Sequence, residues 1–251
     1  MAKRQAKRQR VRKLLLLVSL LLFPITIYYF SPYIIIDGAA QGIINGSFVL
    51  FGLMFLSALF VGRVWCGWAC PAGGLQEFGT LVTDKPARGG KADWIKWGIW
   101  IPWIAIIAIV SIAAGGYHAV NVFHLLEGGI SVAEPAAYVV YYVIIALFLV
   151  PSLVVGRRAG CHYLCWMAPF MIIGRKIRNF FRWPALRLKV DEEKCVDCKL
   201  CTKNCPMSLD VMGMVHRRDM ENSECILCGT CVGICPKDVL RYSLSAGRSA
   251  Q

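Results

Sequence analysis

Four long apolar stretches dominate the first two thirds of the chain and predict membrane-spanning helices. They cover about residues 13–36, 44–62, 97–114 and 136–155, and a helix needs about 20 apolar residues to cross a bilayer. Short polar segments separate the stretches, so the pattern predicts two helical hairpins. After residue 189 the chain instead alternates short apolar groups with cysteines and charged residues, which indicates a separate domain outside the membrane.

The basic residues fall on one side of this predicted membrane region. No Lys or Arg occurs in residues 14–62 or 97–156, so both outer loops lack them, whereas the first 13 residues contain seven. The positive-inside rule therefore predicts a cytoplasmic (inner) membrane protein with both termini in the cytoplasm. No small-residue cleavage site follows the first apolar stretch, so we expect a retained span rather than a signal peptide.

The net charge of +13 is unevenly distributed. The apolar part, residues 1–189, contains 20 of the 28 Lys and Arg residues and 6 of the 15 Asp and Glu residues. In a membrane protein such an excess reports topology and contact with anionic lipid. A nucleic-acid-binding protein would instead carry a basic face on a soluble domain, so we expect the membrane, and no nucleic acid, as a partner.

The strongest motif in the chain is a pair of cysteine runs near its end. Residues 195–206 and 225–236 both have the pattern Cys-x2-Cys-x2-Cys-x3-Cys-Pro, which is typical of bacterial ferredoxins with two 4Fe-4S clusters. In that pattern the fourth cysteine of each run binds the other cluster. One cluster is therefore assigned to Cys195, Cys198, Cys201 and Cys235, and the other to Cys225, Cys228, Cys231 and Cys205.

Two alternatives for these runs are disfavoured. A structural zinc site needs only four ligands, usually from paired Cys-x2-Cys units. A disulfide framework needs an oxidising compartment, but the predicted topology places this region in the cytoplasm. We expect short strands at residues 189–190 and 240–244 and a central hairpin at 211–215. The predicted fold is an α-helical membrane protein, with four transmembrane helices as two hairpins, followed by a C-terminal α+β bacterial-type ferredoxin domain.

These patterns divide the chain into four segments. Residues 1–13 form a basic cytoplasmic head, and residues 14–165 form a four-helix membrane domain. Residues 166–189 mix aromatic and basic residues and are expected to lie in the membrane interface as a basic linker. Residues 190–251 form the ferredoxin domain with two 4Fe-4S clusters.

The other four cysteines form a repeated pair beside the membrane. The second and fourth spans both end in Val-Gly-Arg followed by Cys-x3-Cys, which supplies Cys66, Cys70, Cys161 and Cys165. If the hairpins pack side by side, the four thiolates converge on one additional metal centre, either iron-sulfur, zinc or Cu(I). A redox-active dithiol and reduced cysteines used for packing are the alternatives. Nearby arginines would favour the thiolate form: Arg63, Arg157 and Arg158.

The outer loops contain the remaining polar candidates. His118, His124, Glu127 and Glu134 are suited to accepting protons from a quinol oxidised near the outer face, and the two histidines to binding a metal or haem. We favour the simpler interpretation, in which these side chains cap helices or face water. Weaker candidates lie in the first outer loop: Asp37 and Gln41. No catalytic residue is assigned.

Together, residues 62–71 (GRVWCGWACP), the second cysteine pair and the two ferredoxin runs resemble the NapH-type membrane ferredoxins. This family includes MauN and the cluster-bearing parts of NosR and CcoG. The resemblance implies a quinol dehydrogenase component that passes electrons between the quinone pool and other redox proteins of its pathway, with its ferredoxin end in the cytoplasm. The second pair departs from the family pattern, because Trp166 follows Cys165 where the family has proline.

Two functions from different classes therefore remain open. The first is an electron-transfer subunit of a quinol-linked oxidoreductase. The second is a metal-handling or enzyme-maturation reductase, in which the juxtamembrane cysteines do the work and the clusters supply electrons. A redox sensor is a third class, but the chain has no attached signalling domain that would support it.

Overall fold

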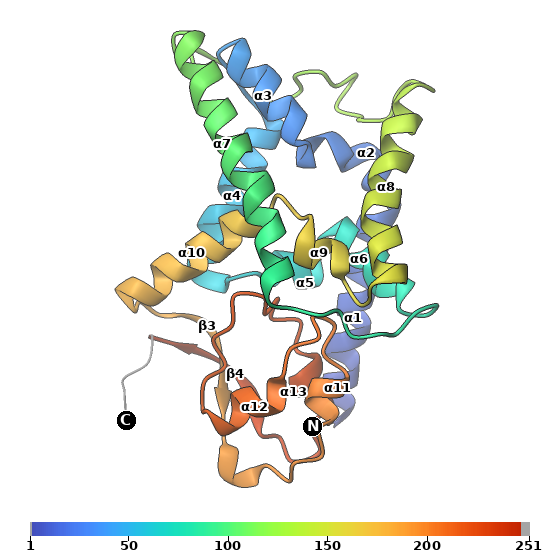
Figure 1. Ribbon diagram of the computed structural model, residues 1–251, viewed down its shortest axis with the longest axis vertical. Coiled ribbons are helices and arrows are strands. Elements are labelled where there is room, and N and C mark those ends of the chain that lie inside the picture. The colour runs from blue at the N-terminus through green and yellow to red at the C-terminus, as the bar shows by residue number, and fades with distance from the viewer. Residues whose placement is uncertain (1, 247–251) are drawn as a thin grey trace.

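The computed structural model describes residues 2–246, with side chains from residue 7 onward, and residues 247–251 of the predicted ferredoxin domain lie outside it. Upright helices occupy one end of the molecule and the cysteine-rich part the other (Figure 1). The segments Lys91–Ala113, which includes η2 (Lys91–Trp94) and α7 (Ile95–Ala113), and α8 (Ala137–Val154) are long and apolar enough to cross a membrane. Their exposed apolar side chains suit a lipid environment.

The first two predicted spans take less regular forms. The helix α1 (Ala2–Leu21) is followed by α2 (Phe23–Thr26) and the 3-10 helix η1 (Ile27–Phe30), and the two sections bend by 61°. Pro24 lies in the first turn of α2, where a proline cannot continue the hydrogen bonding of the preceding helix. The helix α4 (Gly46–Val61) is apolar but has only 16 residues. Among residues 2–246, two helices meet the requirements of a span, or three with the bent pair, so the four-span arrangement stays a prediction.

The outer loops of the two predicted hairpins meet. The strand β1 (Ile43–Asn45), which follows helix α3 (Pro32–Ala40), pairs in parallel with β2 (Ala119–Asn121). Asn45 connects this pair to the helices, because its side chain accepts a hydrogen bond from the Phe48 amide at the start of α4 and donates one to the Ile34 carbonyl. This pairing brings the two hairpins side by side at the outer end.

A layer of short helices separates the upright helices from the cysteine-rich part (Figure 1). It contains α5 (Val64–Trp68), α6 (Pro71–Gly79) and α9 (Ala159–Tyr163), and α10 (Ala168–Phe181) lies beside it and packs along α4. A Cβ atom on Gly174 would lie 2.9 Å from the Phe55 carbonyl oxygen, so this close packing requires glycine. The segment predicted as an interfacial linker is therefore a helix that also buries one face against the protein.

The cysteine-rich part is built on a two-stranded sheet. The strands β3 (Ala185–Val190) and β4 (Leu240–Ser245) are antiparallel, with Leu188 opposite Tyr242. Between them lie η3 (Glu192–Lys194), α11 (Leu200–Lys203), α12 (Val211–His216) and α13 (Thr230–Ile234). The strands agree with the prediction, but the predicted hairpin at residues 211–215 is wrong. The Asp210 side chain accepts a hydrogen bond from the Gly213 amide and caps a helix there instead.

The basic head forms the first half of α1 and runs beside the cysteine-rich part (Figure 1). Gln9 donates a hydrogen bond to the Cys228 carbonyl at 3.1 Å, and Arg8 donates one to the Gly229 carbonyl at 3.4 Å. Arg12 is buried. The head therefore holds the two parts of the protein together in addition to any contact with lipid.

Candidate functional site

The eight cysteines of the two ferredoxin runs surround two separate cavities. One cavity is lined by Cys195, Cys198, Cys201 and Cys235. The other is lined by Cys205, Cys225, Cys228 and Cys231. The fourth cysteine of each run thus lies with the first three of the other run, which is the arrangement that two cubane clusters require.

The two cavities differ in their surroundings. Cys198 beside the first cavity is exposed to solvent, and so are its neighbours Val196 and Leu200. Around the second cavity, Cys205 and Cys228 are buried. The first cavity thus lies near the surface, whereas the second lies deeper. We call their cysteines the outer quartet and the inner quartet.

The juxtamembrane cysteines are brought together in the layer of short helices. Cys66 lies in α5 and Cys161 in the corresponding short helix α9, while Cys70 and Cys165 come just before the longer helices α6 and α10. Both longer helices have a proline in the first turn, although Trp166 directly follows Cys165. All four cysteines, which we call the juxtamembrane quartet, are only 3 to 5% exposed.

The four thiols of the juxtamembrane quartet influence one another. Burial raises the pKa of Cys70 well above that of a free thiol, and the other three thiols raise it further. Burial, followed by Cys161 and Cys66, raises the pKa of Cys165 to about 12. The pKa of Cys161 is also raised, by burial and then by Cys66, although Arg158 opposes the shift. Every pair among the four is therefore in electrostatic contact.

These pKa directions argue against a reactive dithiol. A reactive cysteine has a lowered pKa, because the thiolate is the nucleophile. We expected three arginines to favour the thiolate form here, but burial outweighs Arg63 and Arg158 in their effect on Cys161 and Cys165. Arg157 points elsewhere, because it pairs with Asp84 and donates to the Lys203 carbonyl at 2.5 Å.

The spacing of the thiols does not suit a single metal ion. In the part of the chain that the structure describes, no three His, Cys, Asp or Glu side chains are close enough to hold one ion. The inner and outer quartets do not meet this requirement for a single ion either. In a cubane, each thiol of a quartet would bind a different iron atom. The juxtamembrane quartet gives the same result, although its thiols act on one another electrostatically.

The buried Glu224 and the partly buried Glu77 hold cations around the juxtamembrane quartet. Glu224 accepts hydrogen bonds from Arg63 at 2.9 Å and Lys96 at 2.6 Å. Glu77 accepts bonds from Arg158 at 2.7 Å and from Arg12. The paired cations lower the pKa of each carboxyl group to about 2, even though burial opposes the shift.

Sequence reasoning did not single out either carboxylate, Lys96 or Gln76, which donates a hydrogen bond to the Cys161 thiol at 3.0 Å. Their partners lie far away along the chain, so no local pattern marks them. The one available signal was a charged residue within or beside an apolar segment, as at Lys96.

The inner quartet lies directly against the juxtamembrane quartet. A Cβ atom on Gly67, which follows Cys66, would lie 2.5 Å from the Ile226 carbonyl oxygen. The Trp68 indole donates to the Leu227 carbonyl at 3.1 Å. Since both carbonyls belong to the second ferredoxin run, the three sets of cysteines follow one another from the membrane part to the surface.

A third, partly buried carboxylate fixes the second ferredoxin run to α10 and β3. Glu221 pairs with Arg175, Arg178 and Arg187, and Arg175 also donates to the Cys225 carbonyl at 3.1 Å. Burial alone would raise the pKa of Glu221. The charges of Arg175 and Arg178 and the hydrogen bonds from Asn179 and Arg175 outweigh burial and lower this pKa to about 2. The carboxylate therefore stabilises the folded protein at neutral pH.

Replacing Glu221 by Gln is expected to lower the free energy of unfolding by about 3 kcal/mol at pH 7, which follows from a pKa lowered from 4.5 to about 2. A lowered carboxyl pKa stabilises above the unfolded value and is lost only as pH falls from about 4.5 toward 2. Denaturant unfolding in detergent should therefore show a constant difference from pH 8 to 5. Glu193→Gln, at an exposed position, is the control; an equal effect of both changes would contradict this role.

Polar residues of the two outer loops contact one another. The His124 ring lies 2.6 Å from Asp37, whose carboxylate also accepts a bond from Gln41 at 2.9 Å. The His118 amide donates to the Gly42 carbonyl beside β1. Glu127 and Glu134 line a polar pocket. No metal-binding group of His, Cys, Asp or Glu occurs among the described residues of these loops.

Comparison with known families agrees with the cysteine geometry. A family model described as a 4Fe-4S binding domain matches residues 45–86, which include Cys66 and Cys70. A second, described as a 4Fe-4S dicluster domain, matches residues 194–240, which contain both ferredoxin runs. The protein is therefore an iron-sulfur protein of the ferredoxin type.

Individual relatives indicate which iron-sulfur proteins the chain resembles. The chain is 28% identical to an uncharacterised protein of Methanocaldococcus jannaschii (MJ0749) over 74% of this chain and 66% of the relative. It is 25% identical to the putative electron transport protein YccM of Escherichia coli, over 84% of this chain and 60% of YccM. It is 24% identical to the ferredoxin-type protein NapH of Haemophilus influenzae, over 90% of this chain and 79% of NapH. The chain is similar to members of the NapH-type 4Fe-4S ferredoxin family, and these relatives support an iron-sulfur electron-transfer protein.

The chain spans about two thirds of the first of these relatives and less of YccM. No solved structure matches the chain.

Proposed function

We propose that this protein is the membrane-anchored electron-transfer subunit of a quinol-linked oxidoreductase. The observation that supports the proposal is an apolar pocket with Cys70 in its wall. A membrane-soluble substrate bound there would lie beside the juxtamembrane quartet. The outer and inner quartets would hold the two 4Fe-4S clusters, as assigned from the sequence. Clusters bound there would carry electrons one at a time.

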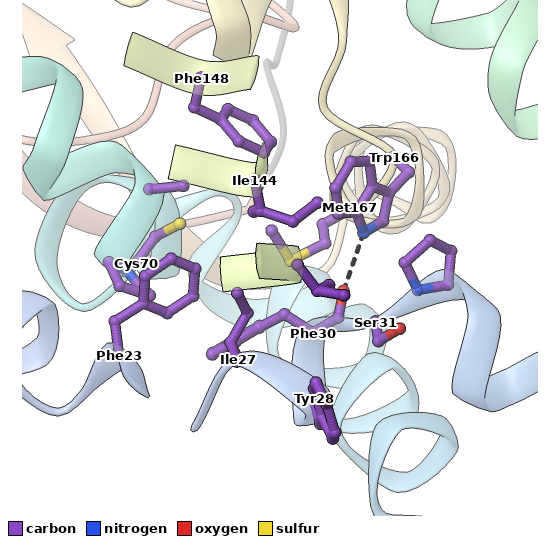
Figure 2. Close-up of a pocket in the computed structure, with 14 residues that line it drawn as sticks. Phe23, Ile27, Tyr28, Phe30, Ser31, Cys70, Ile144, Phe148, Trp166 and Met167 are labelled. Atoms are coloured by element: carbon purple, nitrogen blue, oxygen red, sulfur yellow. Dashed lines mark hydrogen bonds between the residues drawn. The ribbon is translucent and has the colours of Figure 1, made fainter. Parts of the chain in front are cut away.

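The pocket suits a flat, apolar ring. Figure 2 shows Phe23 and Cys70 on one side of it and Trp166 on the other, with Ile144 and Phe148 of α8 closing it. The Trp166 indole donates to the Phe30 carbonyl at 2.9 Å, which fixes its ring in the wall. The cavity is about 60 Å³ in volume, so a quinone ring would enter as side chains rearrange, and Met167 has the flexible side chain for this.

Quinol oxidation releases two electrons and two protons to give the quinone. The electrons would leave on the side of Cys70, toward the ferredoxin part. For the protons, Tyr28 lines both the apolar pocket and the polar outer pocket that contains Glu127 and Glu134. Carboxylates in a solvent-open pocket can accept protons, so this route supports proton release at the outer face.

The proposed setting is the inner membrane, with both termini and the ferredoxin part in the cytoplasm. The absence of Lys and Arg from both outer loops supports this orientation. The exposed surface around Cys198, Val196 and Leu200 is the proposed contact for other redox proteins of the pathway, because it lies beside the outer quartet. We retain residues 14–165 and 190–251 as the membrane and ferredoxin domains in this proposal.

Filling the pocket tests the proposal. Replacing Ile144 by Trp is expected to slow cluster reduction by a quinol analogue at least tenfold, because the new ring occupies the pocket, while reduction by dithionite is unchanged. The matched control is Val143→Trp, on the neighbouring exposed position of α8. Stopped-flow absorbance at the cluster bands gives both rates. Equal quinol rates in the two variants would count against this pocket as the substrate site.

The alternative function, a metal-handling or maturation reductase, gains less support. It requires a metal ion or a disulfide of a partner protein to reach the juxtamembrane thiols. All four are buried, and the apolar pocket beside Cys70 suits neither type of substrate.

A further inference from the structure

Unpaired hydrogen-bond donors surround the juxtamembrane quartet. Arg63 and Arg158 are fully buried, yet Nε and Nη2 of Arg63 and Nε of Arg158 have no hydrogen-bond partner. A buried N–H group without an acceptor is costly, so native proteins rarely leave one unpaired. We therefore expect acceptor atoms for these three N–H donors close to the thiols.

Both arginines lie near thiols of the juxtamembrane quartet. Although burial opposes the shift, Glu224 and then the thiols of Cys66 and Cys165 raise the pKa of Arg63. Burial opposes the shift at Arg158 as well, but Glu77 and the thiols of Cys161 and Cys228 raise the pKa of Arg158. Arg158 also donates to the Cys66 carbonyl at 2.8 Å. Arg158 thus contacts the juxtamembrane quartet directly, and Arg63, three residues before Cys66, is held by Glu224 and the Ser223 carbonyl.

The buried charges around the quartet do not balance. Arg63 and Lys96 share the single carboxylate Glu224, and Arg12 and Arg158 share Glu77, so each group carries a net charge of +1. Buried charges need compensation. The inner quartet has its own excess of cations, since three arginines share Glu221. The two groups near the juxtamembrane thiols therefore favour an anionic occupant with a charge of about −2.

An oxidised 4Fe-4S cluster with four thiolate ligands carries a net charge of about −2 and presents sulfur atoms as acceptors. A single zinc or copper ion would need ligands closer together than the described residues provide. The four cysteines are free rather than disulfide-bonded. A cubane therefore suits the site in four respects: it takes four thiolates, these lie near one another, its charge matches the excess of cations, and its sulfur atoms can accept from the unpaired N–H groups.

We propose that Cys66, Cys70, Cys161 and Cys165 hold a third 4Fe-4S cluster, and that Arg63 and Arg158 donate N–H groups to its sulfur atoms. Gln76 donates to the Cys161 thiol at 3.0 Å and fixes that ligand. The third cluster would connect the apolar pocket to the inner quartet. The inference deepens the proposed function, but it is tested without any quinol.

Iron and acid-labile sulfide are counted in the full chain purified anaerobically. We expect about 12 of each per chain, against about eight for two cubanes. The double change Cys66→Ser and Cys161→Ser should remove about four iron atoms, and Cys198→Ser, in the outer quartet, a different four. About eight iron atoms in the unmodified chain, or stoichiometric zinc or copper, would overturn the proposal.

Mössbauer spectra of the unmodified chain keep the proposal testable if the double variant does not fold, because three cubanes and two differ in total iron and in the components of the reduced spectrum. For the arginines, Arg158→Lys keeps the charge but removes two N–H donors. The Arg158→Lys variant should retain all the iron. The midpoint potential and EPR signal should shift for the cluster that the Cys66→Ser and Cys161→Ser double variant lacks, and for no other. An unshifted potential and signal would overturn the role of the arginines as donors.

Discussion

Replacing Cys205 by Ser is expected to remove the cluster of the inner quartet and to abolish quinol-dependent reduction of the outer cluster. Cys205 belongs to the first ferredoxin run, but it lines the cavity of the second run's cysteines. Burial raises its pKa to about 12, and the next contribution comes from Cys228. Because the inner quartet lies between the membrane part and the outer quartet, its loss should interrupt electron flow even though the outer cluster remains.

The measurement combines iron content, EPR of the dithionite-reduced protein and stopped-flow reduction by a quinol analogue. Iron should fall by about four atoms per chain, and quinol-dependent reduction should fall to background. The matched control is Cys235→Ser, which belongs to the second run but lines the outer cavity. It should remove the outer cluster and leave the inner one reducible. If Cys205→Ser instead removed the outer cluster, the assignment of the fourth cysteines would be wrong.

Replacing Glu224 by Gln is expected to destabilise the protein by about 3–5 kcal/mol, the cost of removing one partner of a buried ion pair. Arg63 and Lys96 both depend on this carboxylate, and both are fully buried. Arg63 belongs to the segment after α4 and Lys96 to α7, whereas Glu224 directly precedes Cys225. The change should therefore loosen the contact between the second ferredoxin run and the membrane part.

Denaturant unfolding in detergent micelles, followed by the cluster absorbance and by tryptophan fluorescence, measures this loss. Glu192→Gln is the control, because it removes an ion pair with the exposed Arg218 and should have little effect. A double change of Glu224 to Gln and Lys96 to Met should recover part of the stability, since it removes one unpaired cation. If Glu224→Gln and Glu192→Gln had equal effects, the buried network would not hold the two parts together.

Several features were predictable because their signals are local. The spacing of the two ferredoxin runs predicts both the cluster type and the exchange of Cys205 and Cys235, since closely spaced cysteines can bind only neighbouring iron atoms. The apolar stretches at residues 97–114 and 136–155 correspond to α7 and α8. Similarly, the strands at both ends of the ferredoxin part follow from short apolar segments, and pairing extends them to residues 185–190 and 240–245.

Other features depend on competition between local and distant contacts. The hairpin expected at residues 211–215 is a helix, because the Asp210 side chain caps its first turn. The first span bends where Pro24 interrupts the helix, and α4 starts only at Gly46 because Asn45 caps it and also bonds to Ile34 of α3. Arg157 pairs with Asp84 and donates to carbonyls of the ferredoxin part, so it does not contact the juxtamembrane thiols as expected. None of these choices is visible from residue type alone.

By itself the sequence determined the class of cofactor, the eight ferredoxin cysteines and the one-sided distribution of basic residues, because each is set by spacing or charge over a short range. Only the tertiary structure brought Cys66 and Cys70 together with Cys161 and Cys165, and placed Glu77 and Glu224 among buried cations. These groups are far apart along the chain. Their approach depends on how the two hairpins and the ferredoxin part pack, which no local pattern records.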